Sequence, residues 1–456
     1  MKICAYVQRQ YAKQNYKNEC FDTRQFVGLR VVMDSLSRAG YPVEWAGIAT
    51  VTEYDIVLVS LTADCDWWEF LKERVTWKKG NYKIIVGGAG VMHVTPFVPF
   101  VDYFSLGRGE ESIVNLVRKL DGKEGYEDDS IIDAREFSPD KIYHVRQTDH
   151  VYPYEVKLTA KNSFKENAIG CNHKCLFCGY TWQRKFLSDK DFYRFSTGLF
   201  DMEDKERAML DLFKDKNSID WRHLRSTAMD GLSERLRFMV NKRITRHMLE
   251  TFLYEMIHTE EIKPHRMKFF NIVGYPTETE EDAFEFLDVL RKIDLEPGRK
   301  LQDKAWGIVL SSMHFNPTPL SPLACAPVSY KNHRHNLHNL LAPKLSGGYI
   351  YSGENLWCVE GMGTETLETV IMRIIAMRGK AEDTENIERL CRTKKFWSAS
   401  KPVQQMTLEK YFDIDYLFGE FDSKTLPTRY LRTYCAVEKF YDKPPWKEPW
   451  IIKPKK

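Results

Sequence analysis

The chain has 456 residues, of which 43% are hydrophobic and 13% aromatic, so two or three domains are expected rather than one. Lys and Arg (67) nearly balance Asp and Glu (64), and the formal net charge of +3 points to no strongly acidic or basic partner. No apolar run approaches the roughly 20 residues that cross a bilayer, so we expect no membrane partner.

The N-terminal residues and the cysteines predict a cytoplasmic protein. Met1-Lys2 leads directly into a strand-like run, so we expect no signal peptide. Apart from one cluster described below, the 10 cysteines are scattered along the chain. That distribution is typical of buried, reduced thiols in a reducing compartment.

Residues 1–122 alternate short apolar strands with helices. The expected strands are 3–7, 43–49, 55–60, 83–88 and 103–106, and the expected helices are 23–38, 67–75 and one ending at 120. This alternation predicts a Rossmann-like, doubly wound parallel sheet. Ligands bind such sheets at the carboxyl ends of the strands, where the glycine pairs Gly87-Gly88 and Gly107/Gly109 fall.

Residues 123–163 are charged and irregular, and we interpret them as a linker with a hairpin around 142–157. A strand at 164–169 then begins the second domain and delivers a cysteine loop. Cys171, Cys175 and Cys178 follow the spacing C-x3-C-x2-C, with Phe177 just before the last cysteine. Three thiolates this close can hold three corners of a cubane iron–sulfur cluster and leave the fourth iron open. Zinc is the alternative, although structural zinc sites usually pair two separated C-x2–4-C units.

Three later segments carry motif-like patterns. Asp230 begins the first, which contains Ser233 and Arg235 and has the form of a helix start with Asp230 or Ser233 as N-cap. In the second, Gly274 and Pro276 predict a tight exit from a strand, followed by a helix with a capping box at 279–282. The third is a proline-rich strand exit that begins with His314-Phe315.

Residues 330–456 are predicted to be mostly helical, with an apolar stripe along 364–377. The chain ends in an aromatic, proline-rich tail at 444–450. Such a tail typically packs across a catalytic mouth or between domains. A basic end of this kind also occurs in nucleic-acid binders, but one short run is weak support for that function.

Taken together, the cysteine trio and the three later segments resemble the radical S-adenosylmethionine (radical SAM) superfamily. Residues 1–122 are similar to the cobalamin (B12)-binding domain that precedes the catalytic core in one class of that superfamily. The resemblance implies a partial (βα)6 TIM-type barrel over 164–329, followed by the helical C-terminal domain, 330–456. It also implies that the three cysteines hold a [4Fe-4S] cluster, which cleaves SAM reductively to a 5′-deoxyadenosyl radical.

The same resemblance assigns candidate site residues. Those implied to contact SAM are Phe177, Asp230, Ser233, Arg235, Gly274, Pro276, His314 and Phe315. Those implied to line a cobalamin cleft are Trp67, Gly87, Gly88, Gly107 and Gly109. Two family motifs are missing: a D-x-H-x-x-G segment for cobalt and, between 178 and 222, a G-G-E segment for the SAM amino group.

The reaction class remains open at this point. A cobalamin-dependent methyltransferase is the leading hypothesis, with a small molecule or peptide as substrate and an external flavodoxin- or ferredoxin-type reductant. The alternative is a rearrangement, elimination or oxidation with an N-terminal domain that binds no cobalamin. A zinc-stabilised nucleic-acid-binding protein is the remaining, non-enzymatic alternative. The sequence identifies no catalytic residue, no particular substrate and no oligomeric state.

Overall fold

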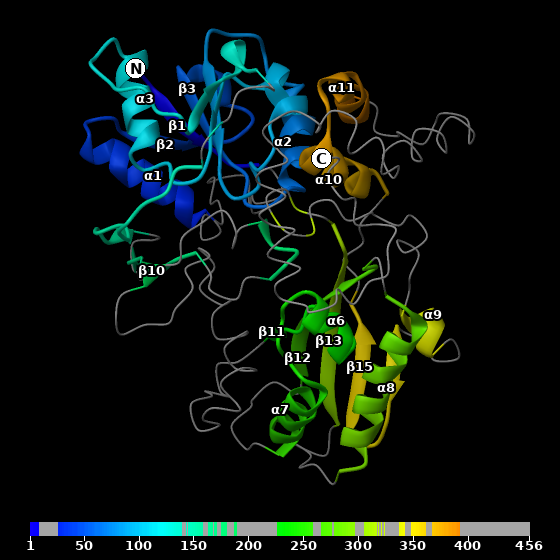
Figure 1. The fold of residues 1–456 in the computed structure, drawn as a ribbon. Coiled ribbons are helices and arrows are strands. Elements are labelled where there is room, and N and C mark those ends of the chain that lie inside the picture. Colours follow the sequence, from blue (N-terminus) through cyan, green and yellow to red (C-terminus); the bar gives the residue numbers. More distant parts are fainter. Residues whose placement is uncertain are drawn as a thin grey trace, which may run out of the picture.

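The computed structural model describes most of two α/β units. Its described residues are 1–8, 26–138, 143, 145–157, 163–166, 168–170, 175–179, 187–188, 226–258, 266–275, 278–296, 305–316, 318, 321, 323, 337–342, 348–361 and 367–392. Each unit is built on a sheet of mainly parallel strands (Figure 1). The predicted α/β class is confirmed. The described strands form two open sheets of six and five strands, two separate two-stranded ladders and no closed barrel.

The first sheet has six strands in the order β2-β1-β3-β4-β5-β6. They are β1 (Ile3–Tyr6), β2 (Val43–Ala46), β3 (Ile56–Ser60), β4 (Lys83–Gly87), β5 (Tyr103–Ser105) and β6 (Ile131–Asp133). The first five are parallel, and β6 adds an antiparallel edge. The range 123–163 therefore contains a sheet strand as well as a connection, because Ile131 and Ile132 supply an apolar run beside β5. The strand order reverses between β1 and β3, which is where doubly wound sheets bind ligands.

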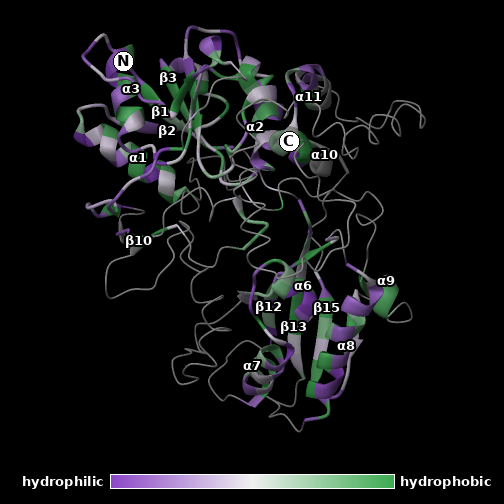
Figure 2. Cartoon of the chain, viewed as in Figure 1, coloured by the Kyte–Doolittle hydropathy of each residue, from purple (hydrophilic) through white to green (hydrophobic). Residues whose placement is uncertain are grey.

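Helices cover both faces of this sheet. On one face lie α1 (Val27–Arg38) and α3 (Ser112–Leu120), whose apolar sides share a core with β1, β3 and β4. On the other lie α2 (Asp66–Arg74) and three short 3-10 helices, η3 (Val51–Glu53), η4 (Thr95–Phe100) and η5 (Ala134–Glu136). Two layers of helix explain why the central strands are apolar throughout, since both of their faces are buried (Figure 2).

The second sheet has five strands in the order β11-β12-β13-β15-β14. They are β11 (Ser226–Ala228), β12 (Arg266–Val273), β13 (Trp306–His314), β15 (Leu356–Glu360) and β14 (Tyr349–Ser352). All but β14 run parallel. The helices of this unit are α6 (Glu234–Met239), α7 (Arg246–His258), α8 (Glu280–Asp294) and α9 (Leu337–Leu341), and α7 and α8 bury one face of the sheet.

Two small ladders lie along the chain between the sheets. Strand β7 (Val156–Lys157) pairs with β8 (Ser163–Phe164), and β9 (Ala168–Ile169) pairs with β10 (Leu187–Ser188). Strand β9 leads into the cysteine loop.

The described part of residues 330–456 is mostly helical, but its elements are divided between the two units instead of forming one domain. Strands β14 and β15 complete the second sheet, because their aromatic and β-branched residues suit a pleated surface, with β15 beside β13 and β14 at the edge. The helices α10 (Leu367–Arg378) and α11 (Thr384–Arg392), joined by η8 (Ala381–Asp383), instead pack beside α2 on the first unit (Figure 1). The aromatic tail lies outside the described residues. No described helix is long and apolar enough to span a bilayer.

Candidate functional site

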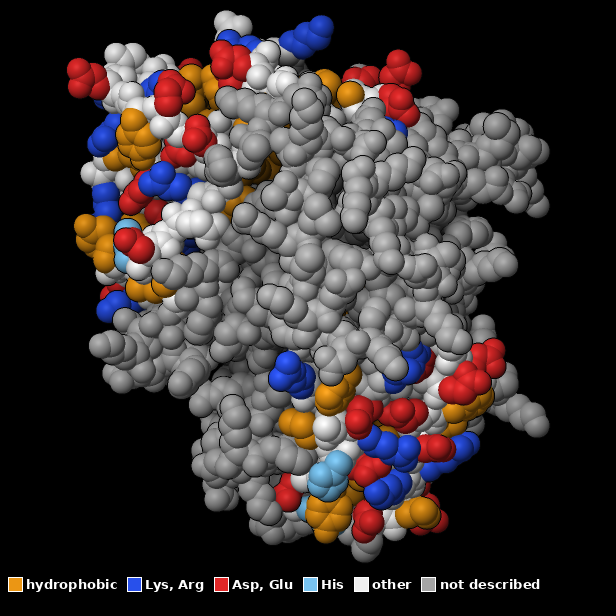
Figure 3. All heavy atoms as spheres, in the orientation of Figure 1, with side chains coloured by type: hydrophobic (Ala, Val, Ile, Leu, Met, Phe, Trp, Pro, Cys, Tyr) orange, Lys and Arg blue, Asp and Glu red, His pale blue; other side chains and the backbone are white. Residues whose placement is uncertain are grey.

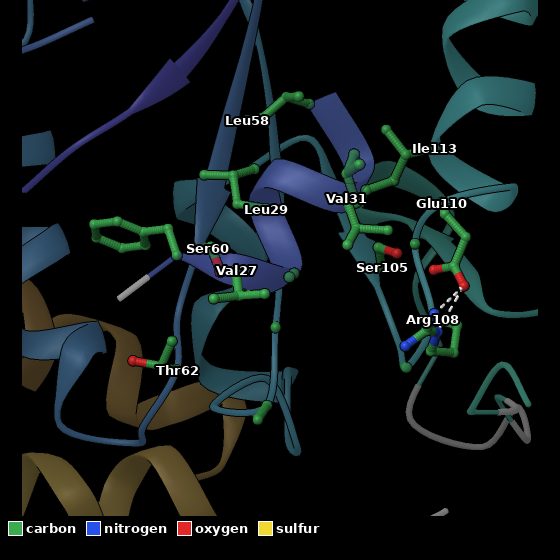
Figure 4. A pocket seen from close by; sticks show the side chains of 18 of the residues that line it. Val27, Leu29, Val31, Leu58, Ser60, Thr62, Ser105, Arg108, Glu110 and Ile113 are labelled. Atoms are coloured by element: carbon green, nitrogen blue, oxygen red, sulfur yellow. Dashed lines mark hydrogen bonds and ion pairs between the residues drawn. The ribbon is translucent and has the colours of Figure 1, made fainter. Parts of the chain in front are cut away.

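A cavity opens at the carboxyl edge of the first sheet. Its volume is about 150 Å³, and it lies between the ends of β3, β4 and β5 and the start of α1 (Figure 4). Leu29, Val32 and Ile113 give it apolar walls, while Ser60 and Thr62 add hydroxyl groups at the end of β3. The cavity therefore lies at the carboxyl edge of the sheet, where α/β sheets bind ligands, next to the β1/β3 reversal rather than in it.

The predicted glycines line this cavity, and two of them leave no room for a side chain. A Cβ on Gly88 (φ +106°) would lie 2.3 Å from the carbonyl oxygen of Leu61. On Gly107 (φ +89°) it would lie 2.5 Å from the carbonyl oxygen of Arg146. The strand-end loops can approach this closely only because both residues are glycine.

Trp67 does not belong to the cavity wall. It is fully buried on the opposite face of the sheet, where its ring stacks on Phe97 with centroids 3.9 Å apart. The reason is that α2, which carries Trp67, covers the face of the sheet that α1 and α3 do not.

The polar groups of the cavity are either hydroxyls or already paired charges. Ser105 is 2% exposed, and its Oγ has no hydrogen-bond partner among the described residues. Arg108 donates to Glu110 (2.6 Å) and to both oxygens of Glu166 (2.6 and 2.7 Å). Two carboxylates thus outweigh one guanidinium, so the cavity is not built for a phosphate and suits a neutral ligand.

The cysteine loop lies against the second sheet. Cys171 falls outside the described residues, whereas Cys175 is buried and Cys178 partly buried. The Leu176 N–H donates to the carbonyl of Val240 (2.9 Å), and the Leu176 carbonyl accepts from the Leu323 N–H (3.0 Å). The loop is therefore fixed to the end of α6 and to the chain that follows β13.

An apolar cluster brings the predicted segments together beneath this loop. Leu176 is fully buried among side chains that come from α6 and from the exits of β12 and β13. These side chains are Leu236, Met239, Val240, Tyr275, Phe315 and Leu323, with Phe177 and Ile272 at the margin. The segments predicted around 230–237, 274–276 and 314–316 thus meet at the cysteine loop, although 59 to 145 positions separate them from Cys171 in the sequence.

Asp230 occupies a strained position at the end of β11. Its φ is +53°, which is uncommon for a residue with a Cβ and typical of constrained sites. Its Oδ2 lies 2.9 Å from Lys242 Nζ in a buried ion pair, and its carbonyl accepts from the Tyr275 hydroxyl (2.9 Å). Sequence reasoning missed Lys242, which is brought to Asp230 only by the turn after α6.

Ser233 and Arg235 have structural partners. Ser233 is the N-cap of α6, as the helix-start interpretation predicts, and its Oγ accepts from the Leu236 N–H (3.1 Å). Arg235 pairs with Asp282, which also forms the predicted capping box with Thr279 at the start of α8. A contact from Ser233 or Arg235 to SAM remains a prediction.

The turn after β12 is held by a buried carboxylate that sequence reasoning did not single out. Gly274 has φ +81°, and the Glu278 carboxylate accepts from the backbone N–H groups of Gly274 and Tyr275, the latter at 3.0 Å. Burial raises the Glu278 pKa to about 7, against the lowering effect of these two hydrogen bonds. Pro276 lies outside the described residues.

His314 and Phe315 follow β13 beside the same turn. Phe315 is 3% exposed, donates its N–H to the Val273 carbonyl (2.8 Å) and packs its ring 5.1 Å from that of Tyr275. His314 is also buried. Both residues therefore lie at the carboxyl edge of the second sheet, close to the support of the cysteine loop.

Comparison with known proteins adds no family to these observations. Neither the family models nor the curated proteins include a match to this chain. Within the described residues, which do not include Cys171, no three His, Cys, Asp or Glu side chains are grouped closely enough to hold a metal ion. The candidate site thus comprises the cavity of the first unit and the cysteine loop of the second.

Proposed function

We propose that this protein is a radical SAM enzyme and that Cys171, Cys175 and Cys178 hold its [4Fe-4S] cluster. The observation that supports this proposal is the meeting of three separate sequence segments beneath the cysteine loop. A chance C-x3-C-x2-C spacing gives no reason for segments 230–237, 274–276 and 314–316 to gather there. A cluster with one open iron is also the site that three thiolates of this spacing suit best.

The residues around the loop have distinct roles under this proposal. The cluster, when bound, supplies one electron for the cleavage of SAM, and an external flavodoxin- or ferredoxin-type reductant supplies that electron to the protein. Leu176 fixes the loop, and Phe177 presents its ring at the margin of the apolar cluster. Asp230, at its strand end, accepts hydrogen bonds from the ribose hydroxyls. The Gly274 turn bounds the SAM pocket with backbone groups.

The first unit fits a cobalamin-binding role. Its strand order, its glycine-lined edge and a cavity large enough for one flat aromatic ring support this part of the proposal. The Ser105 hydroxyl and the apolar parts of the wall suit the neutral base at the end of a cobalamin tail. Cobalamin supplies methyl-transfer chemistry, so a methyltransferase acting on a small molecule or peptide is the leading candidate.

The alternative reaction class is rearrangement, elimination or oxidation without cobalamin. Its support is the missing D-x-H-x-x-G segment, which leaves no histidine in that position for cobalt. Anaerobic incubation with hydroxocobalamin followed by desalting separates the two classes. A retained corrin absorbance supports the methyltransferase, and its loss supports the alternative.

Formation of 5′-deoxyadenosine tests the main proposal. Protein reconstituted anaerobically with iron and sulfide, then given dithionite and SAM, should release 5′-deoxyadenosine. A C171A/C175A/C178A variant should release none, whereas Cys65→Ala, which removes a thiol outside the trio, should behave as the parent. Equal product from the parent and the triple variant would overturn the proposal.

Metal analysis tests the non-enzymatic alternative. One zinc per chain without iron or sulfide would favour a zinc-stabilised nucleic-acid-binding protein. On the face seen in Figure 3, however, the described acidic and basic side chains are interspersed rather than gathered into a basic patch. That distribution does not favour a nucleic-acid partner.

A further inference from the structure

One buried carboxylate connects three distant parts of the chain. Asp64 lies just beyond β3, two residues after Thr62 of the cavity wall, and is 8% exposed. Its Oδ2 accepts from Asn316 Nδ2 (2.7 Å), 252 positions away, and from Arg373 Nε (2.8 Å), 309 positions away. The cavity rim, the exit of β13 and helix α10 therefore meet at one oxygen atom.

The loop that carries Asp64 is held firmly in the first unit. Asp66, itself 3% exposed, accepts from the Thr62 N–H and hydroxyl (both 2.7 Å) and from the Ala63 N–H (3.0 Å). From the other side Gly90 approaches so closely that a Cβ there would lie 2.3 Å from the Ala63 carbonyl oxygen. Asp64 is thus presented from a backbone with little freedom to adjust.

Arg373 and Asn316 contribute differently to the junction. Arg373 belongs to α10, whose neighbouring residues Met372 and Ile374 are buried in the core of the first unit, so its guanidinium compensates the Asp64 charge within that unit. Asn316 follows β13 of the second unit, directly after Phe315. Phe315 in turn packs in the cluster that supports Leu176 of the cysteine loop. The neutral Asn316 amide is therefore the group that links the second unit to this carboxylate.

We infer that Asp64 is a positioning residue that, through Asn316, sets the placement of the cavity relative to the cysteine loop. This inference rests on the proposed function, in which a ligand of the cavity and a cluster on the cysteine loop act on one substrate. A misplacement of about 1 Å between reacting groups can reduce a rate about 100-fold, so a rigid link at this junction has catalytic value.

The distance between the two units tests this inference in the full-length chain. Spin labels are introduced as non-natural amino acids at Arg118 on α3 and Arg291 on α8, two exposed positions on different units. Pulsed electron–electron resonance then gives the distribution of label–label distances. Asn316→Ala removes the amide without leaving a buried charge unpaired, and should broaden or shift this distribution.

Asn355→Ala is the matched control. Asn355 also donates a side-chain hydrogen bond, from Nδ2 to the Asp294 carbonyl (2.8 Å), but both partners belong to the second unit. This variant should leave the label–label distribution as in the parent. A distribution that is unchanged in Asn316→Ala, or changed equally in both variants, would overturn the inference.

Iron and sulfide analysis of the same samples separates this inference from the proposed function. A parent that takes up no cluster contradicts the proposed function whatever the label distances show. A parent with a full cluster and an Asn316→Ala variant with unaltered distances contradicts only the positioning role. The expected result is a full cluster in both proteins, with an altered distance distribution in the variant.

Discussion

The raised pKa of Glu278 makes the stability of the turn after β12 depend on pH. Its carboxylate is the acceptor for the turn at Gly274 and Tyr275, and its Oε1 has no partner among the described residues. Burial is the main cause that raises its pKa from 4.5 to about 7. The folded protein therefore holds this proton more tightly than the unfolded chain does.

The raised pKa of Glu278 predicts a loss of stability toward neutral pH. Its contribution is fully present below pH 4.5, the unfolded value, and is lost as the pH rises through about 7. The free energy of unfolding should fall by on the order of 3 kcal/mol over this pH range. Denaturant unfolding of the parent and of Glu278→Gln at pH 5 and pH 7.5 measures this decrease. The parent should lose stability relative to the variant, and parallel pH profiles would contradict this account.

Residues whose roles depend on local geometry could be predicted from the sequence. Ser233 as an N-cap and Thr279 with Asp282 as a capping box follow from short-range hydrogen-bonding patterns, and the structure confirms both. The Asp230–Lys242 ion pair could not be predicted, because it depends on how the chain turns after α6. The position of Trp67 could not be predicted either, because the sequence does not tell which face of the sheet α2 covers.

The first turns of helices α8 and α6 are joined by the side chain of Asp282. Asp282 accepts from the Thr279 N–H (2.8 Å), pairs with Arg235 and also accepts from the Ser233 hydroxyl. A single carboxylate thus fixes the first turns of two helices, one of which, α6, packs against the cysteine loop.

Asp282→Ala should therefore destabilise the second unit by about 2 kcal/mol, the sum of a lost cap and a lost charged hydrogen bond. Hydrogen exchange of the first turns of α6 and α8 should become faster in the same variant. Asp288→Ala, which alters a half-exposed carboxylate on α8, serves as the control and should change neither quantity. Equal effects of the two substitutions would show that Asp282 has no special role.

Some elements could be predicted from the sequence and others could not. Strands β1, β3, β4 and β5 are buried on both faces, so each stands out as a short apolar run, whereas the edge strand β2 is only partly buried. Strands β14 and β15 are short, and their place depends on the pairing of β15 with β13, 50 positions earlier, and of β14 with β15. The apolar stripe of α10 predicts a buried face, but not that this face would pack on the first unit.

At the scale of the whole molecule, the chain passes from the first unit to the second and then returns. Helices α10 and α11 add to the core of the first unit, and Arg373 on α10 meets Asp64 beside Asn316 of the second. Because α10 packs back on the first unit, its Arg373 completes the junction between the cavity rim and the residues that pack under the cysteine loop. No local sequence pattern predicts this junction, because it joins residues hundreds of positions apart.

The cluster proposed on Cys171, Cys175 and Cys178 has one iron left for SAM. Electron paramagnetic resonance of the anaerobically reconstituted, dithionite-reduced protein, before and after addition of SAM labelled with nitrogen-15 in its methionyl amino group, tests it most directly. We expect about four irons and about four sulfides per chain, a cluster signal that changes with SAM, and hyperfine coupling to the labelled nitrogen. A colourless protein, or a cluster signal that SAM leaves unchanged, would contradict it.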